Sequence, residues 1–175
     1  MKRSLVLFKD EFQSLDKVQD EIPDFLNEKY LTGDNQKYMK MYNWMSGGYD
    51  IVEAVVGKLK YGNQVNKMRQ DTMNKLEWKN NLSVLYVSIG TGKNLEFVPK
   101  NIDSTSLNIF GADISSGMLK KCKKKYADKL NLTLVNCCAE DLPFKDNSFD
   151  IVFHVLFLTY ASWIRAPSAL VAASM

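Results

Sequence analysis

The second half of the chain contains four short apolar runs, at 84–89, 107–112, 132–137 and 149–158, and these constrain the fold most strongly. Turn residues separate the runs, and one long amphipathic segment, 115–130, lies between the second and the third. A strand that is covered on both faces of a parallel sheet reads as a continuous apolar run. The pattern therefore predicts an α/β core over residues 79–158 with about four parallel strands.

The first half has a different pattern. From about residue 15 to residue 78 the apolar residues recur at helical spacing, as in Val18, Ile22 and Phe25 and again in Ile51, Val55 and Leu59. Proline and glycine residues interrupt this pattern. We expect three or four helices and no strands in an N-terminal helical segment, 1–78, that precedes the sheet.

Composition places the whole chain in one domain. Its 175 residues are 46% hydrophobic and 25% charged, as in an ordinary globular protein. The last stretch, 159–175, is rich in alanine and serine, and we expect an atypical tail there with one short helix. Its apolar residues are interrupted by Arg165 and Pro167, so the sequence predicts no integral membrane span. Residues 1–12 do not resemble a cleaved secretory signal.

The net charge and the positions of the cysteines limit the classes of binding partner that the sequence predicts. The net charge is only +3, and five lysines cluster in the segment 115–130. We interpret them as a solvated helix face, with an anionic partner as the alternative, and predict no nucleic-acid binding. The three cysteines form no C-x-x-C pair, and Cys137 and Cys138 are adjacent, so no metal site is expected. Free thiols are typical of a reducing compartment and favour a cytoplasmic location.

A glycine turn directly follows the first apolar run. Gly90, Thr91 and Gly92 are small enough for the backbone to approach a ligand, and the residues after them can open a helix whose N–H groups are unpaired. Val87 stands where a phosphate-binding P-loop needs its first glycine. Leu95 stands where a G-x-G-x-x-G dinucleotide fingerprint needs its third, which disfavours nicotinamide or flavin.

An acidic residue ends the second apolar run. Asp113 follows Gly90 by 23 positions, close to the roughly 20-residue interval at which such a carboxylate meets a nucleoside ribose. A simpler interpretation is that Asp113, or Ser115 beside it, caps the next helix. The two roles can coexist.

Four ordered motifs resemble a known family. They are Y-D at 49–50, T-G-x-N-L at 91–95, A-E-D-L-P-F at 139–144 and S-F-D-I-V at 148–152. Together they resemble the ubiquinone/menaquinone-biosynthesis-like (methyltransferase type 11) branch of class I S-adenosylmethionine-dependent methyltransferases, over about residues 38–155. The resemblance implies a Rossmann-like sheet, and methyl transfer from S-adenosylmethionine to a small molecule by in-line displacement, with catalysis mainly by positioning.

The resemblance also implies site residues. Gly90 and Gly92, with Thr91 and Ser88 beside them, would hold the amino-acid part of the cofactor. Asp113 would bind the ribose hydroxyls and Ile114 would pack on the adenine. The remaining cofactor contacts would come from Cys138, Ala139, Glu140 and His154.

No catalytic residue is evident, and His154 and Tyr49 are the candidates. His154 would lie near the transferring methyl, with core packing as the alternative. Tyr42 and Tyr49 could close over the cofactor, but their helical spacing also fits a core.

The sequence departs from the family in ways that suggest a second functional class. Tyr86 stands where a carboxylate is usual, Ser88 replaces a glycine, and Cys138 replaces aspartate or asparagine. A tyrosine hydroxyl cannot supply negative charge opposite the cofactor's ammonium group, so weaker cofactor binding is a hypothesis. Family sheets usually have seven strands, and this chain is expected to be truncated after the fourth. The fourth strand would then present an open edge for self-association. The alternative function is an inactive fragment that binds cofactor weakly or acts as an interaction module.

Overall fold

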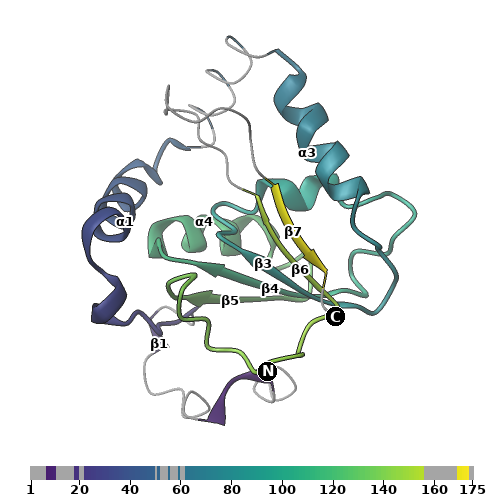
Figure 1. Ribbon diagram of the computed structural model, residues 1–175. Helices are drawn as coiled ribbons and strands as arrows, with labels where there is room; N and C mark the ends of the chain where they lie inside the picture. Colours follow the sequence, from purple (N-terminus) through teal and green to yellow (C-terminus); the bar gives the residue numbers. More distant parts are fainter. Residues whose placement is uncertain are drawn as a thin grey trace.

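A five-stranded sheet organises the computed structural model, which describes residues 7–10, 18–19, 22–49, 51, 55, 59, 62–155 and 169–173 (Figure 1). The strand order is β5-β4-β3-β6-β7. Four strands are parallel: β3 (Ser83–Val87), β4 (Asn108–Asp113), β5 (Leu132–Asn136) and β6 (Ile151–Val155). The predicted α/β class with four parallel strands is therefore confirmed.

The parallel strands are apolar throughout because both faces of the sheet are covered. In β3, Val84 and Tyr86 belong to one buried cluster, and Leu85 and Val87 belong to the other. This is the alternation expected of a strand, whose successive side chains point to opposite faces. The first cluster includes residues of η4 (Lys93–Phe97), α3 (Gln64–Asn74) and α4 (Ser116–Tyr126).

Aromatic side chains cover the opposite face. Phe8, from the N-terminal segment, lies 5.0 Å from Phe144 between ring centroids, and Phe144 lies 5.0 Å from Phe149. Phe110 of β4 completes the group. Both distances fall in the range of favourable ring pairs. Among the described residues, this face is packed by irregular segments rather than by a helix.

The N-terminal half is only partly helical. The helix α1 spans Gly33–Met45, and residues 49, 51, 55 and 59 are also helical. However, β1 (Val18–Gln19) and β2 (Ile22–Pro23) form an antiparallel pair, and the 3₁₀ helix η3 (Glu28–Tyr30) follows. The helix predicted through Val18, Ile22 and Phe25 is wrong. The backbone N–H of Phe25 instead donates to the carbonyl of Asn136 at 2.8 Å, which holds this segment beside β5.

The C-terminal residues also differ from the expectation. The strand β7 (Ala169–Ala173) pairs antiparallel with β6, from Ile151 opposite Ala173 to Val155 opposite Ala169. The predicted open edge of β6 is wrong, because β7 supplies backbone hydrogen-bond partners at that edge. Residues 169–173 are a strand and not part of the expected short helix, and the rest of the stretch 159–175 lies outside the described residues. Self-association through an open β6 edge therefore loses its basis. Across the described ranges, no helix combines the length and the apolar composition needed to cross a membrane.

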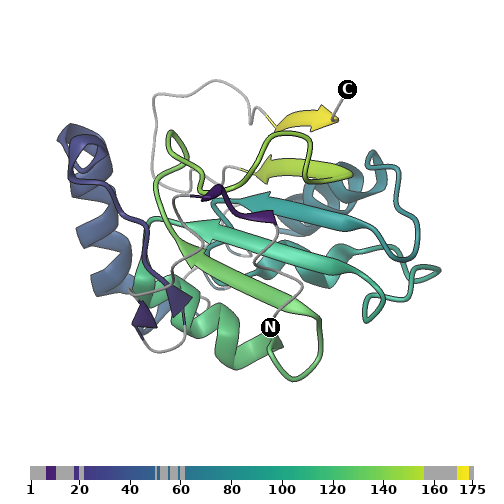
Figure 2. The same ribbon diagram turned by 90° about the horizontal axis from the view of Figure 1, so that it is seen from below.

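The topology places a ligand site at one end of the sheet. The chain runs from β3 outward to β4 and β5, and β6 then lies on the other side of β3. In such sheets ligands bind at the carboxyl ends of the strands, where the strand order reverses. Figure 2 shows α1 standing beyond the ends toward which the arrows of β3, β4 and β5 point.

Candidate functional site

A cavity of about 480 Å³ opens at the carboxyl ends of β3, β4 and β6. Its volume is within the range of small-molecule sites. Nine residues singled out in the sequence line it: Tyr42, Tyr49, Tyr86, Ser88, Gly90, Thr91, Asp113, Ile114 and His154. The other lining residues are Asn35, Tyr38, Arg69, Ile89, Lys93, Asn94, Met118 and Val155.

The glycine turn and the acidic end of β4 are in direct contact. The backbone N–H of Gly90 donates to Asp113 Oδ2 at 2.8 Å. The N–H of Ser115 donates to Oδ1 at 2.8 Å, and the hydroxyl of Ser115 caps α4 by accepting from the N–H of Met118 at 3.2 Å. Asp113 thus accepts a hydrogen bond in the turn before α4, and Ser115 is the residue that caps the helix. Asp113 also lines the cavity, where a ligand can reach it. A carboxylate has about four acceptor positions, so the backbone N–H groups of Gly90, Ser115 and Ile114 leave capacity for a hydroxyl donor.

Burial controls the ionisation of Asp113. It raises the pKa of this carboxyl to about 6, although the hydrogen bonds from the N–H groups of Ser115 and Gly90 act in the opposite direction. Desolvation disfavours the charged form of an acid. A ligand that donates hydrogen bonds to the carboxylate would restore part of the lost solvation.

Gly92 has a structural position that differs from the expectation. It has φ of 78° and does not appear among the residues that line the cavity. A Cβ at Gly92 would lie 2.7 Å from Tyr126 Cε2 and 2.8 Å from Cys122 Sγ. The missing side chain therefore lets the turn pack against α4, and a contact of Gly92 with the cofactor stays a prediction.

The segment 138–140 reaches the site indirectly. Cys138 is buried, Ala139 and Glu140 are exposed, and the cavity lining in the described part of the chain includes none of the three. Glu140 Oε1 accepts a hydrogen bond from Asn35 Nδ2 at 3.0 Å, and Asn35 lines the cavity. The contact ties this segment to the rim of the cavity.

The helix α1 forms one wall. Tyr42 stacks with Tyr38 at 6.4 Å between ring centroids and meets Tyr49 edge-on at 5.9 Å. All three line the cavity, and no residue of α1 within Gly33–Met45 is buried, so the core interpretation does not apply to Tyr38 and Tyr42. Burial, and then the charge of Asp113, raise the pKa of Tyr42.

A side chain of α1 fixes this wall to α4. Asn43 Oδ1 accepts hydrogen bonds from the Ser115 hydroxyl at 2.7 Å and from the N–H of Gly117 at 3.0 Å. A Cβ at Gly117 would lie 2.7 Å from Ser46 Oγ, so glycine permits the close approach of the two helices.

The sequence analysis missed two site residues, Arg69 and Asn94. Arg69 Nη1 donates to Asn94 Oδ1, and Asn94 Nδ2 donates to the Tyr86 hydroxyl at 2.5 Å. Arg69 follows Val65 by one helical turn and precedes the buried Met73 by another. An arginine on the apolar face of a helix was therefore a usable signal, because charged residues are rarely buried without a partner.

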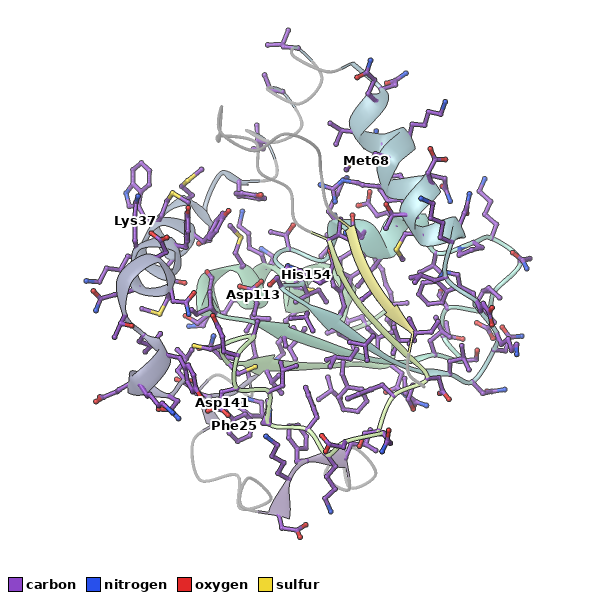
Figure 3. The ribbon with its side chains drawn as sticks, in the orientation of Figure 1. Phe25, Lys37, Met68, Asp113, Asp141 and His154 are labelled. Atoms are coloured by element: carbon purple, nitrogen blue, oxygen red, sulfur yellow. The ribbon has the colours of Figure 1, made fainter. Side chains whose placement is uncertain are left out.

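His154 is among the residues that line the cavity. It stands on β6 opposite Val87 of β3, and Figure 3 shows it near Asp113 between α1 and α3. Its Nε2 is buried and has no hydrogen-bond partner among the described residues. Burial lowers the pKa of His154 below its usual 6.5, so the ring is neutral at pH 7. Within the same residues, no three His, Cys, Asp or Glu side chains are grouped to hold a metal ion.

A glycine turn joined to an acidic strand end at a topological switch point is typical of the Rossmann-like class of α/β proteins. Comparison with known families agrees with this class. Residues 84–173, half of the chain, match the family described as methyltransferase domain. The chain belongs to this family.

The similar proteins support the predicted branch. A demethylmenaquinone methyltransferase of Listeria welshimeri is 33% identical over 120 residues, which are 67% of this chain and 48% of the relative. A ubiquinone/menaquinone biosynthesis C-methyltransferase of Campylobacter jejuni is 29% identical over 122 residues, 67% of this chain and 49% of the relative. The chain thus spans about half the length of these curated relatives. The resemblance to this branch is confirmed.

A solved structure shows the same fold. It is phosphoethanolamine N-methyltransferase 1 of Haemonchus contortus in complex with phosphoethanolamine and S-adenosylhomocysteine. The TM-score is 0.54 at 14% identity, over 73% of this chain and 27% of that chain.

Proposed function

We propose that the cavity binds S-adenosylmethionine and that the protein transfers its methyl group to a small molecule. The observation that carries this proposal is the 2.8 Å contact between the Gly90 N–H and Asp113 Oδ2. This contact places two features in one cavity. The glycine turn allows close approach of the backbone to a ligand, and the carboxylate can accept hydrogen bonds from ribose hydroxyls. The relatives named as methyltransferases support the same reaction.

Each part of the cavity has a proposed role. Asp113 accepts hydrogen bonds from the ribose hydroxyls, and Ile114 packs against the adenine. Ser88, Gly90 and Thr91 surround the methionine part. Contact of Cys138, Ala139 and Glu140 with the adenine edge remains a prediction, because this segment reaches the cavity only through Asn35.

Positioning supplies most of the catalysis in this proposal. The cofactor contributes an activated methyl group on a sulfonium, so the protein must align the acceptor and keep water out. Proximity and orientation can contribute about 7–11 kcal/mol to such a step. The wall formed by Tyr38, Tyr42 and Tyr49 would exclude water on the side of α1.

A proton acceptor is needed when the methyl acceptor loses a proton. His154 is the first candidate for this role, because the residue lines the cavity and burial lowers the pKa of its imidazole. Tyr49 is the second candidate from the same lining. By analogy with the named relatives, we propose a reduced quinone-type ring as the first acceptor to test, with thiols and amines as further classes.

Titration calorimetry with S-adenosylhomocysteine tests the cofactor site. Asp113→Asn keeps the size of the side chain and removes its charge, so affinity should fall about 10- to 100-fold, as expected for hydrogen bonds to a charged group. Asp103→Asn is the matched control, because Asp103 is exposed and its oxygen accepts from the N–H of Thr105 in a local turn, as Asp113 does from Ser115. Unchanged affinity in Asp113→Asn, or no binding by the wild-type chain, would overturn the proposal.

Transfer of a radiolabelled methyl group to a panel of quinols, thiols and amines tests the reaction. His154→Gln should reduce the rate more than it reduces cofactor affinity. Binding of S-adenosylhomocysteine without transfer to any acceptor would favour the alternative function, a cofactor-binding chain without catalysis.

A further inference from the structure

The helix α1 carries part of the cavity wall but contributes no side chain to the core. Tyr38 and Tyr42 line the cavity, and none of the residues Gly33–Met45 is buried. The helix packs against α4, which begins shortly after Asp113 (Figure 1). A segment with few buried apolar contacts opens easily unless other contacts hold it. The position of this wall therefore depends on the polar contacts between α1 and α4.

The side chain of Asn43 links α1 to the first turn of α4. Its Oδ1 accepts hydrogen bonds from the Ser115 hydroxyl at 2.7 Å and from the N–H of Gly117 at 3.0 Å. An amide oxygen has two lone pairs, so these two donors use both. The N–H groups of the first turn have no partner within their own helix. Asn43 therefore caps α4 from another helix, beside the cap that Ser115 provides.

The same hydrogen bonds connect the wall to Asp113. The N–H of Ser115 donates to Asp113 Oδ1 at 2.8 Å, while the hydroxyl of Ser115 donates to Asn43. Tyr42 directly precedes Asn43, and it is close enough to Asp113 for the charge of that carboxylate, after burial, to raise the pKa of Tyr42. Asn43 and Ser115 thus fix the position of Tyr42 relative to Asp113.

The surroundings of Gly117 show that the two helices lie close together at this contact. A Cβ at Gly117 would lie 2.7 Å from Ser46 Oγ and 3.3 Å from Asn43 Oδ1. Beyond the end of α1, Lys121 Nζ donates to the carbonyl of Gly47 at 2.8 Å. Of these contacts, the one made by Asn43 is adjacent in sequence to the tyrosine wall.

We propose that Asn43 is a positioning residue: by capping α4 from α1, it holds the wall of Tyr38, Tyr42 and Tyr49 in place over a ligand bound at Asp113. The inference rests on the proposed binding of S-adenosylmethionine. Asn43 itself is not among the described residues that line the cavity, so it acts through the wall. Loosening the wall opens the route by which a bound ligand leaves, so Asn43 should control the dissociation rate.

Three variants separate this role from a general effect on folding. Asn43→Ala removes the acceptor oxygen. Asn43→Asp keeps an acceptor for both donors, and a carboxylate is favourable at a helix N-terminus. Asn108→Ala is the matched control, because Asn108 is also half-buried and its Oδ1 accepts a side-chain hydrogen bond, from Asn131 Nδ2 at 2.7 Å. Asn108 begins β4, so it lies at the end of the strand away from Asp113.

Release of radiolabelled S-adenosylhomocysteine into an excess of unlabelled ligand measures the dissociation rate. This rate should rise about 5- to 100-fold in Asn43→Ala, the equivalent of two ordinary hydrogen bonds, and stay close to the wild-type rate in Asn43→Asp and Asn108→Ala. A variant that is only less stable contains fewer molecules able to bind, but each of them releases ligand at the wild-type rate. A merely structural role of Asn43 would therefore leave the dissociation rate unchanged.

Limited digestion with trypsin tests the contact without a ligand. Lys37 and Lys40 are exposed on α1, so cleavage after them should be faster in Asn43→Ala than in the wild-type chain and should return to the wild-type rate in Asn43→Asp. Equal cleavage of the wild-type chain and Asn43→Ala would refute the inference.

The outcomes also separate this inference from the proposed function. If the wild-type chain binds S-adenosylhomocysteine and Asn43→Ala releases it at the wild-type rate, the role of Asn43 is refuted and the cofactor site stands. If the wild-type chain does not bind this ligand, the cofactor site fails and the role of Asn43 fails with it.

Discussion

The two glycines of the turn after β3 should have separable roles, in spite of their similar backbone conformations. Gly92 has φ of 78°, and an added Cβ would lie 2.7 Å from Tyr126 and 2.8 Å from Cys122. Gly92→Ala therefore combines two costs. A left-handed conformation costs a residue with a side chain about 1–2 kcal/mol. Overpacking a buried site costs about 1–3 kcal/mol. We expect the free energy of unfolding to fall by about 2–5 kcal/mol.

Gly90 is the matched control for this change. Its φ is 56°, and no described atom beyond its chain neighbours lies within 4 Å of an added Cβ. Gly90→Ala should therefore lose only the conformational part, about 1–2 kcal/mol. Its new methyl group would instead occupy the cavity that Gly90 lines, so affinity for S-adenosylhomocysteine should fall at least tenfold. Gly92→Ala should show a smaller loss of affinity at temperatures where it is folded.

Urea denaturation followed by tryptophan fluorescence measures the stability difference, and calorimetry measures the affinities. The slope of the free energy with urea should be the same in all three proteins, so that shifts in midpoint report stability. Equal destabilisation by the two substitutions would show that packing against α4 is not what requires Gly92. A larger loss of affinity in Gly92→Ala than in Gly90→Ala would refute the separation of roles.

Three further predictions concern ionisation, backbone strain and thiols. Because burial raises the pKa of Asp113 from 3.8 to about 6, the folded chain binds this proton more tightly than the unfolded chain, so stability falls as the pH rises from about 4 to about 6; the loss, at most about 3 kcal/mol, should be absent from urea titrations of Asp113→Asn. Ser88 has φ of 57°, and Ser88→Gly should raise the free energy of unfolding by about 0.5–1 kcal/mol, whereas Asn147→Gly, at φ of 56°, should change it less because asparagine tolerates this conformation. The three cysteines are buried and form no disulfide in the described part of the chain, so a thiol reagent should modify the folded chain slowly and the unfolded chain at all three sites, and rapid reaction of the folded chain would contradict this burial.

The sequence predicted the centre of the fold because the signal there is local. Every residue from Val84 to Val87 is buried, since the sheet is covered on both faces, and such a run can be recognised without knowledge of its neighbours. The meeting of Gly90 and Asp113 was also predictable, because the carboxyl ends of adjacent parallel strands lie at one edge of the sheet. The spacing of 23 residues covers the connection that contains η4 and then the strand β4.

The parts that were mispredicted depend on contacts between distant segments. Ile22 and Phe25 have helical spacing, but Pro23 cannot donate a backbone hydrogen bond and Phe25 bonds to Asn136 of β5. No local pattern reports the presence of that strand edge. The strand β7 was missed for a similar reason, since an alanine-rich segment favours a helix until the edge of β6 offers pairing.

The division of the cavity between two parts of the chain explains why family membership does not decide ligand preference. Asp113 and Gly90 lie within residues 84–173, which match the methyltransferase domain, so the residues proposed to contact the nucleoside belong to the part that the family model covers. Arg69 lies on α3, before the matched range, yet its guanidinium is held against Asn94 and Tyr86 from within that range. A substitution at position 86 therefore acts together with a residue that the family model does not cover. Replacing Tyr86 by a carboxylate should therefore change the affinity for S-adenosylhomocysteine by different amounts in the wild-type chain and in Arg69→Gln, because both positions contact Asn94.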